Sequence, residues 1–122
     1  FNRIRRVLDQ RLSKVYLQEA PLYSIHLGVA GRVDLIGEFD SKISIIDFKT
    51  SAKPKKYEWI HNYFMQKTAY AIAFEERTGI PIVDLVTIIV NDVDDECQVF
   101  KEKRDRWVQP LFDTIHRYHQ SL

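Results

Sequence analysis

The sequence contains a single cysteine, Cys97, and this scarcity excludes several kinds of site. One thiol cannot form an intrachain disulfide, a four-cysteine zinc site or a cysteine-held iron–sulfur cluster. Long apolar runs are also missing, since none approaches the roughly 18 residues that a membrane span needs. No Gly-rich phosphate-binding loop is present, which disfavours nucleotide hydrolysis of the P-loop type. These absences indicate a protein of a reducing, intracellular setting with no membrane partner.

An excess of one charge is absent as well. The 18 Lys and Arg residues nearly balance the 17 Asp and Glu residues, and the formal net charge is +1. Bulk charge therefore does not identify a nucleic-acid binder, and a polyanionic partner would have to meet a local patch. With 122 residues, four glycines, four prolines and no repeat or linker, residues 1–122 are expected to form a single domain. Because the chain begins at Phe1, we expect it to be a fragment or a processed piece.

Hydrophobic periodicity predicts an α/β fold, a mixed β-sheet flanked by helices in the order α-βββ-α-β-(β)-α. Turn and breaker residues set the boundaries, with Pro21 ending the first helix and Gly79 the second. The expected elements are a helix over 1–18, strands over 22–30, 31–39 and 42–49, a helix over 57–77, strands over 84–90 and 96–101, and a helix over 104–120.

A hairpin is expected around the turn residues Asp40 and Ser41. This turn places Asp34 directly opposite Asp47, with their Cβ atoms about 4.5–5.5 Å apart. Lys49 projects to the same face, because side chains alternate along a strand. A bulge would shift this register by one residue. The other face takes an apolar set, namely Val33, Leu35, Ile46 and Phe48.

Two carboxylates held this close repel one another unless a cation or a proton intervenes. Hard oxygen ligands suit Mg²⁺, which uses one or two protein carboxylates and keeps several waters. A lysine amine beside such a metal can position an attacking water and stabilise charge on a phosphate. These residue types fit hydrolysis of a phosphodiester. Spacing alone leaves a second interpretation open, an exposed ion-pair cluster on a sheet face.

Three short segments follow one another in a fixed order and together are far more specific than a lone Asp-x-Lys. They are Gly31-Arg-Val-Asp34-Leu-Ile, Ile45-Ile-Asp47-Phe-Lys49-Thr50-Ser51 and Gln66-Lys-Thr-Ala-Tyr70. This set resembles the PD-(D/E)XK nuclease superfamily, and within it the pattern is similar to the RecB-type branch. Glu19-Ala-Pro-Leu22 and the residues from Lys49 to Lys55 also resemble the mitochondrial genome maintenance exonucleases and their phage relatives.

The resemblance implies a restriction-endonuclease-like core and a Mg²⁺- or Mn²⁺-dependent exonuclease that acts on single-stranded DNA ends. It implies that Asp34 and Asp47 coordinate the metal, together with the backbone carbonyl of Phe48. Lys49 would then be the catalytic lysine, and Glu19 an acidic residue near the metal. Relatives often carry an upstream helical region, which this chain is expected to lack. The resemblance places the protein in DNA repair, replication or recombination, in the cytoplasm of a phage or bacterial system or in the mitochondrial matrix.

Further residues are expected to contact DNA. The resemblance implies that Gln66 and Tyr70 lie on a helix beside the site and orient Lys49 or the strand. Trp59 and Tyr63 share the spacing of that helix face, which is equally compatible with core packing. A basic loop follows the hairpin. It either adds salt-sensitive affinity for the DNA backbone or is simply solvated. The remaining predicted substrate contacts are Thr50, Ser51, Lys53 and Lys55.

Two other functions stay open at this point. One is a non-catalytic DNA-binding or assembly module that retains the nuclease fold, and its binding would depend on salt but not on metal. The other is a metal-dependent phosphoesterase for small substrates, which DNA would fail to inhibit.

Overall fold

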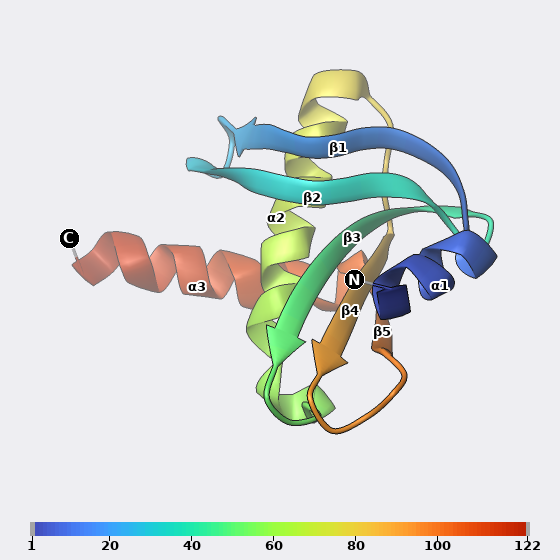
Figure 1. Cartoon of the computed structure of the whole chain (residues 1–122). Helices are drawn as coiled ribbons and strands as arrows, with labels where there is room; N and C mark the ends of the chain where they lie inside the picture. Colours follow the sequence, from blue (N-terminus) through green and yellow to red (C-terminus); the bar gives the residue numbers. More distant parts are fainter. Residues whose placement is uncertain (1, 122) are drawn as a thin grey trace.

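The helices and strands follow the predicted order, and the fold is α/β with a mixed sheet, as in restriction-endonuclease-like proteins (Figure 1). The computed structural model describes residues 2–121. Its elements are α1 (Asn2–Arg11), β1 (Leu12–Ser24), β2 (Val29–Phe39), β3 (Lys42–Ser51), η1 (Tyr57–Trp59), α2 (His61–Thr78), β4 (Asp84–Asn91), β5 (Gln98–Lys103), η2 (Arg104–Arg106) and α3 (Val108–Ser121).

The five strands form one sheet in the order β1-β2-β3-β4-β5. β3 and β4 pair in parallel, and the other neighbours pair antiparallel. The parallel pair requires a crossover, which α2 supplies. The carboxyl ends of β3 and β4 therefore lie at the same edge of the sheet, as their arrowheads show in Figure 1.

The predicted first helix is too long. Its first residue lies outside the described residues, and α1 ends at Arg11, where the amide of Asp40 donates to the Arg11 carbonyl. From Leu12 the chain pairs with β2, so residues 12–18 are strand and not helix. β1 is an edge strand, which explains why it tolerates Pro21 in its interior. Backbone pairing with β2 here overrides a helix-like apolar spacing.

The predicted hairpin turn is confirmed. Asp40 and Ser41 have φ angles of 52° and 69°, the left-handed conformation that two-residue hairpin turns adopt. The β2–β3 ladder runs from Phe39↔Lys42 to Leu35↔Ile46 and ends there. The predicted direct pair between Asp34 and Asp47 is therefore not part of the ladder.

The end of the β2–β3 ladder also changes the face of the sheet on which one predicted core residue, Val33, lies. Val33 packs with the core against α2, whereas Leu35 and Ile46 pack in the core on the other side of the sheet. The prediction that all of them share one face is wrong, because strict alternation stops where the β2–β3 ladder ends. The strand predicted over 22–30 is also interrupted, by a turn at residues 25–28 that joins β1 to β2.

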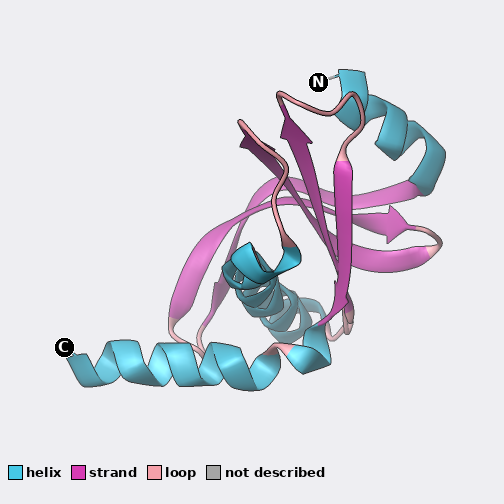
Figure 2. Cartoon of the chain, turned by 90° about the horizontal axis from the view of Figure 1, so that it is seen from below, coloured by secondary structure: helices cyan, strands magenta, loops and turns pink. Residues whose placement is uncertain are grey.

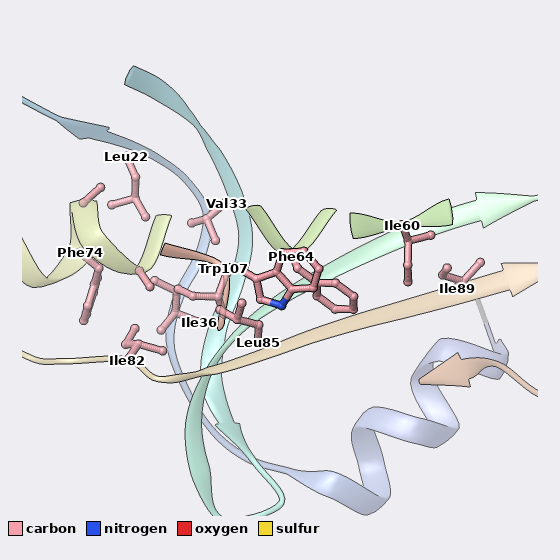
Figure 3. Packing of buried hydrophobic residues seen from close by; sticks show 13 residues of the cluster. Leu22, Val33, Ile36, Ile60, Phe64, Phe74, Ile82, Leu85, Ile89 and Trp107 are labelled. Carbon is pink, nitrogen blue, oxygen red and sulfur yellow. The ribbon is translucent and has the colours of Figure 1, made fainter. Parts of the chain in front are cut away.

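Both faces of the sheet are covered, by α1 on one side and by α2 on the other (Figure 2). The larger core lies between the sheet and α2, where Phe64 packs at a ring-centroid distance of 5.4 Å from Trp107 (Figure 3). Ile60 and Ala71 are buried there as well. α2 starts at His61, so Trp59 lies before it in the separate turn η1, and Gly79 caps its end with a φ of 75°.

Candidate active site

Asp34, Asp47 and Lys49 come together where β2 and β3 diverge. The ammonium of Lys49 lies 3.2 Å from Oδ2 of Asp47. The amide of Phe48 donates to Oδ2 of Asp34 at 3.0 Å, so this carboxylate takes the place of a backbone acceptor beyond the end of the ladder. The two carboxyl groups are close enough for each to shift the pKa of the other. Their closeness thus arises from a side-chain link across the strands and not from a regular cross-strand pair.

The electrostatics of the two carboxyl groups differ. Burial and the neighbouring carboxyl of Asp47 raise the pKa of Asp34, only partly offset by the Phe48 amide and by Lys49. Asp47 is more deeply buried, which raises its pKa, but the hydrogen bond with Asp34 and the charges of Lys67 and Lys49 outweigh burial and lower it. Asp47 is therefore the more acidic member of the pair, and Asp34 is the one whose negative charge is less well stabilised.

Sequence reasoning missed Lys67, which is fully buried with 0% of its side chain exposed. Its Nζ lies 3.4 Å from Oδ2 of Asp47 and 3.2 Å from the carbonyl oxygen of Tyr63. Burial lowers the pKa of Lys67 to about 8, against the opposing effect of Asp47. The sequence held a signal for this residue, since Lys67 falls on the apolar stripe of α2 together with Phe64 and Ala71. A lysine on a core-facing stripe needs a buried acid as its partner.

Gln66 and Tyr70 lie beside this cluster on α2. Nε2 of Gln66 donates to the Tyr70 hydroxyl at 3.2 Å. The Tyr70 ring fills the space over Gly31, where an added Cβ would lie 2.7 Å from the tyrosine oxygen. The glycine of the Gly-x-x-Asp segment and the tyrosine of the Gln-x-x-x-Tyr segment are therefore two halves of one contact, next to Asp34.

Glu19 lies opposite Asp34 in the β1–β2 register, between the pairs Gln18↔Leu35 and Ala20↔Val33. Its side chain is exposed, and its φ of 48° is unusual for a residue other than glycine. Among residues 2–121, no three Asp, Glu, His or Cys side chains come together as a group that could hold a metal ion. Glu19 therefore does not complete such a group with the two aspartates, and its role and that of the Phe48 carbonyl stay predictions.

The remaining predicted substrate contacts lie further along the chain. Thr50 and Ser51 end β3 beyond Lys49, with Thr50 exposed and the Ser51 hydroxyl donating to the carbonyl of Lys53 at 2.6 Å. The backbone of Lys55 is held to β5 by both its amide and its carbonyl, each bonded to the side chain of Gln98. Within the described part of the chain, no hydrogen bond or ion pair connects these four residues to the aspartates.

Tyr63 lies between the two lysines, with Lys49 Nζ at 4.9 Å and Lys67 Nζ at 5.7 Å from its ring centroid. An aromatic face at this range attracts an ammonium group. Tyr63 thus belongs to the cluster, whereas Trp59 is 59% exposed and pairs instead with Lys56, whose Nζ lies 5.3 Å from its ring centroid. The predicted helix face is split accordingly, one aromatic ring supporting the site and the other open to solvent.

Comparison with known proteins identifies the family. No curated protein matches the chain. Within residues 2–121 no helix is long and apolar enough to cross a membrane. A family model described as the PD-(D/E)XK nuclease superfamily matches residues 2–119. Since that match spans nearly the whole chain, and since the mixed sheet and its flanking helices agree with the fold, the chain belongs to the PD-(D/E)XK nuclease superfamily.

Proposed function

We propose that this chain hydrolyses phosphodiester bonds of DNA at Asp34, Asp47 and Lys49, and that it acts as an exonuclease on single-stranded ends. The superfamily consists of nucleases that generally use a divalent metal ion, usually Mg²⁺, and DNA is the substrate that the family suggests. One observation carries the proposal: Asp34 accepts from the Phe48 amide at 3.0 Å, between Asp47 and Lys49, and the ammonium of Lys49 lies 3.2 Å from Asp47.

The residues present fit a hard divalent cation. The raised pKa of Asp34 marks a place where a carboxylate lacks compensating positive charge. Mg²⁺ needs only one or two protein carboxylates and takes its other ligands from water and phosphate, so two aspartates suffice. Asp34 and Asp47 would hold the ion, with the Phe48 carbonyl and Glu19 as further proposed ligands, and Mn²⁺ is a proposed substitute. When bound, the ion supplies Lewis acidity and a more nucleophilic water.

The protein's own groups have separate tasks in this proposal. The Lys49 side chain is 31% exposed, so its ammonium can reach a phosphate while Asp47 and the ring of Tyr63 hold it in place. Its charge would stabilise the negative charge that develops on the phosphate as water attacks. Gln66 and Tyr70 would orient the strand, and the lysine-rich segment after β3, with Thr50, Ser51, Lys53 and Lys55, would contact the backbone.

The preference for single-stranded ends rests on the resemblance to the RecB-type branch and to the mitochondrial genome maintenance exonucleases. A solvent-exposed Trp59 beside Lys56 agrees with it, because an exposed indole next to a cation suits stacking of an unpaired base.

The test is a cleavage assay with Mg²⁺ or Mn²⁺ on labelled linear single strands, linear duplexes and circular single strands. We expect cleavage of linear single strands and none of circles, which have no end. Asp47→Ala and Lys49→Ala should each reduce the rate at least about a hundredfold, the usual scale for removing one group that stabilises transition-state charge. Asp40→Asn, at the other end of the hairpin, is the matched control and should leave the rate unchanged. Cleavage that survives both site substitutions would place the activity elsewhere.

A second candidate is a non-catalytic DNA-binding module, which one observation favours. Asp47 already has two ammonium partners, Lys49 and Lys67, so part of the cluster is balanced without a metal. Salt-sensitive DNA binding that is indifferent to divalent ions, with no cleavage under any cation, would establish this function instead.

A further inference from the structure

Lys67 is the one group of the cluster that the proposed reaction does not use. It projects from α2 into the main core, with no exposed side-chain surface. Its Nζ contacts Oδ2 of Asp47 at 3.4 Å and the Tyr63 carbonyl at 3.2 Å. The rings of Tyr63 and Phe64 lie 5.7 Å and 5.9 Å from it. No solvent path remains for this ammonium, so it cannot contact a DNA strand directly.

A buried ammonium is expensive to keep, and a core position would be more stable with an apolar side chain of similar volume. Phe64 and Ala71 lie on the same stripe of α2 and are both apolar and buried. Packing alone would therefore favour an apolar side chain at position 67. The retained charge must therefore act through its single acidic contact, Asp47. Lys49 and Lys67 reach the same oxygen of that carboxylate, at 3.2 Å and 3.4 Å. Two cations on Oδ2 restrict how the carboxylate can rotate.

The charges of the cluster cancel. The groups that act on Asp47 are the carboxyl of Asp34 and the two lysines, Lys49 and Lys67. Two carboxylates and two ammonium groups have no net charge, whereas a divalent ion binds best where negative charge is in excess. A metal entering this cluster meets two ammonium groups that oppose it. A phosphodiester bound at the same time would supply the missing negative charge.

We propose that Lys67 is a positioning residue that fixes Asp47 and, by cancelling site charge, makes firm binding of the divalent metal depend on a bound DNA phosphate. This inference rests on the proposed nuclease function of the same cluster. Linkage makes the effect reciprocal, so the metal strengthens DNA binding by the same factor as DNA strengthens metal binding. Metal and substrate would then assemble the site together, and the free protein would hold little metal.

The experiment measures Mn²⁺ affinity by calorimetry or by the spectroscopic signal of free Mn²⁺. Wild-type protein is titrated alone and with a short phosphorothioate single strand that resists cleavage. The variants are Lys67→Met, which removes the buried charge and keeps the length, and Lys42→Met, which removes an exposed lysine at the turn end of the hairpin as the matched control. Wild type should bind Mn²⁺ at least about tenfold more tightly with DNA than without. That is the size expected for one unit charge near a divalent ion, even in a water-like dielectric.

For Lys67→Met, Mn²⁺ should bind the DNA-free protein about tenfold more tightly than it binds wild type, and the additional effect of DNA should shrink. Lys42→Met should behave as wild type in both titrations. A lysine with a purely structural role would change the melting temperature and leave the ratio of the two Mn²⁺ affinities unaltered. That unaltered ratio in folded Lys67→Met would overturn the proposal.

The wild-type titrations stand by themselves if Lys67→Met fails to fold. Equal Mn²⁺ affinity with and without DNA would overturn the inference and leave a metal-dependent nuclease intact. Absence of Mn²⁺ binding in both titrations would instead remove the proposed function, because no metal site would exist. The two failures are therefore distinct in a single data set.

Discussion

The β2–β3 hairpin carries a charged cluster around an aspartate at each end, and the two clusters differ in their number of acids. At the turn, Asp40 receives two bonds from Arg11, at 2.8 Å and 2.5 Å, and one from Lys101 at 2.7 Å. At the open end, Asp47 also has two cation partners, but it lies against a second carboxyl group, that of Asp34. One end has one acid for two cations, and the other has two acids for two cations.

The difference shows in the direction of the pKa shifts. Arg11 and Lys101 hold the pKa of Asp40 well below its usual range, so its charge favours the folded state. Burial and Asp47 raise the pKa of Asp34, so its charge opposes the folded state at neutral pH. A structural ion pair and a candidate active site therefore use the same residue types. What separates them is the sign of the effect that the carboxylate charge has on stability.

The sharpest test of this comparison is Asp34→Asn, which keeps an oxygen for the Phe48 amide and removes the charge. Cleavage should fall at least about a hundredfold, as expected when a charged group of the reaction centre is removed. In the same variant the free energy of unfolding should rise by about 1 kcal/mol at neutral pH, the trade-off typical of strained active sites. Urea unfolding in the presence of a chelator measures the second effect without stabilisation by bound metal.

The sign of that gain follows from the raised pKa of Asp34. The carboxyl group of Asp34 binds its proton at higher pH in the folded protein than in the unfolded chain. The free energy of unfolding of the wild type is therefore lowered at pH values where Asp34 is ionised in both the folded and the unfolded state. The gain of Asp34→Asn should thus be largest near neutral pH and shrink as the solution becomes acidic. A variant less stable than wild type at neutral pH would show that the two carboxylates are well compensated.

The open end also depends on a close contact between Gly31 and the Tyr70 ring. A Cβ at Gly31 would lie 2.7 Å from the Tyr70 oxygen and 2.8 Å from a ring carbon of Tyr70. Gly31→Ala should therefore lower the free energy of unfolding by about 2 kcal/mol, the usual result of forcing one group into a packed site. Urea unfolding of Gly31→Ala, Tyr70→Ala and the double variant forms the test. In the Tyr70→Ala background, Gly31→Ala should hardly change the free energy of unfolding. Additive losses of stability in the double variant would contradict the contact.

Much of the hairpin was predictable, because local chemistry determines it. Asp40 tolerates the left-handed conformation of the turn, and alternation along β3 puts Asp47 and Lys49 on one face. Gly79 ends α2 in the left-handed conformation that glycine favours. In each case the local conformation depends only on a few adjacent residues. The element order followed from the same signals.

The errors have a different origin, since each depends on residues distant in the sequence. Residues 12–18 have apolar positions at helical spacing, but backbone pairing with β2 makes them strand. Val33 changes face because the β2–β3 ladder stops at Leu35. The segment from Gln66 to Tyr70 does not reveal the role of Lys67, because its partner Asp47 is 20 residues away in the sequence. The candidate site was thus predictable in its strand residues and not in the helix residue that completes its charge balance.

The smallest expected effect lies at the turn. Asp40→Asn suits the left-handed backbone, where φ is 52°, because asparagine adopts that conformation readily. The substitution therefore removes charge without straining the turn. At neutral pH it should lower the free energy of unfolding by about 1 kcal/mol, a small value because the pairs with Arg11 and Lys101 are partly exposed.

The pH dependence of this loss has the opposite sign to that at Asp34. The folded-state pKa of Asp40 is depressed, so its contribution is complete above the unfolded value of about 4 and disappears as pH falls toward the folded value. Urea unfolding of wild type and Asp40→Asn at a series of pH values should therefore show two curves that converge in acid. High salt should narrow the gap at neutral pH as well, because exposed pairs are screened. A gap that stays constant in acid would mean that the carboxylate of Asp40 acts through hydrogen-bond geometry alone, and the contrast between the two ends of the hairpin would then be one of burial and not of charge.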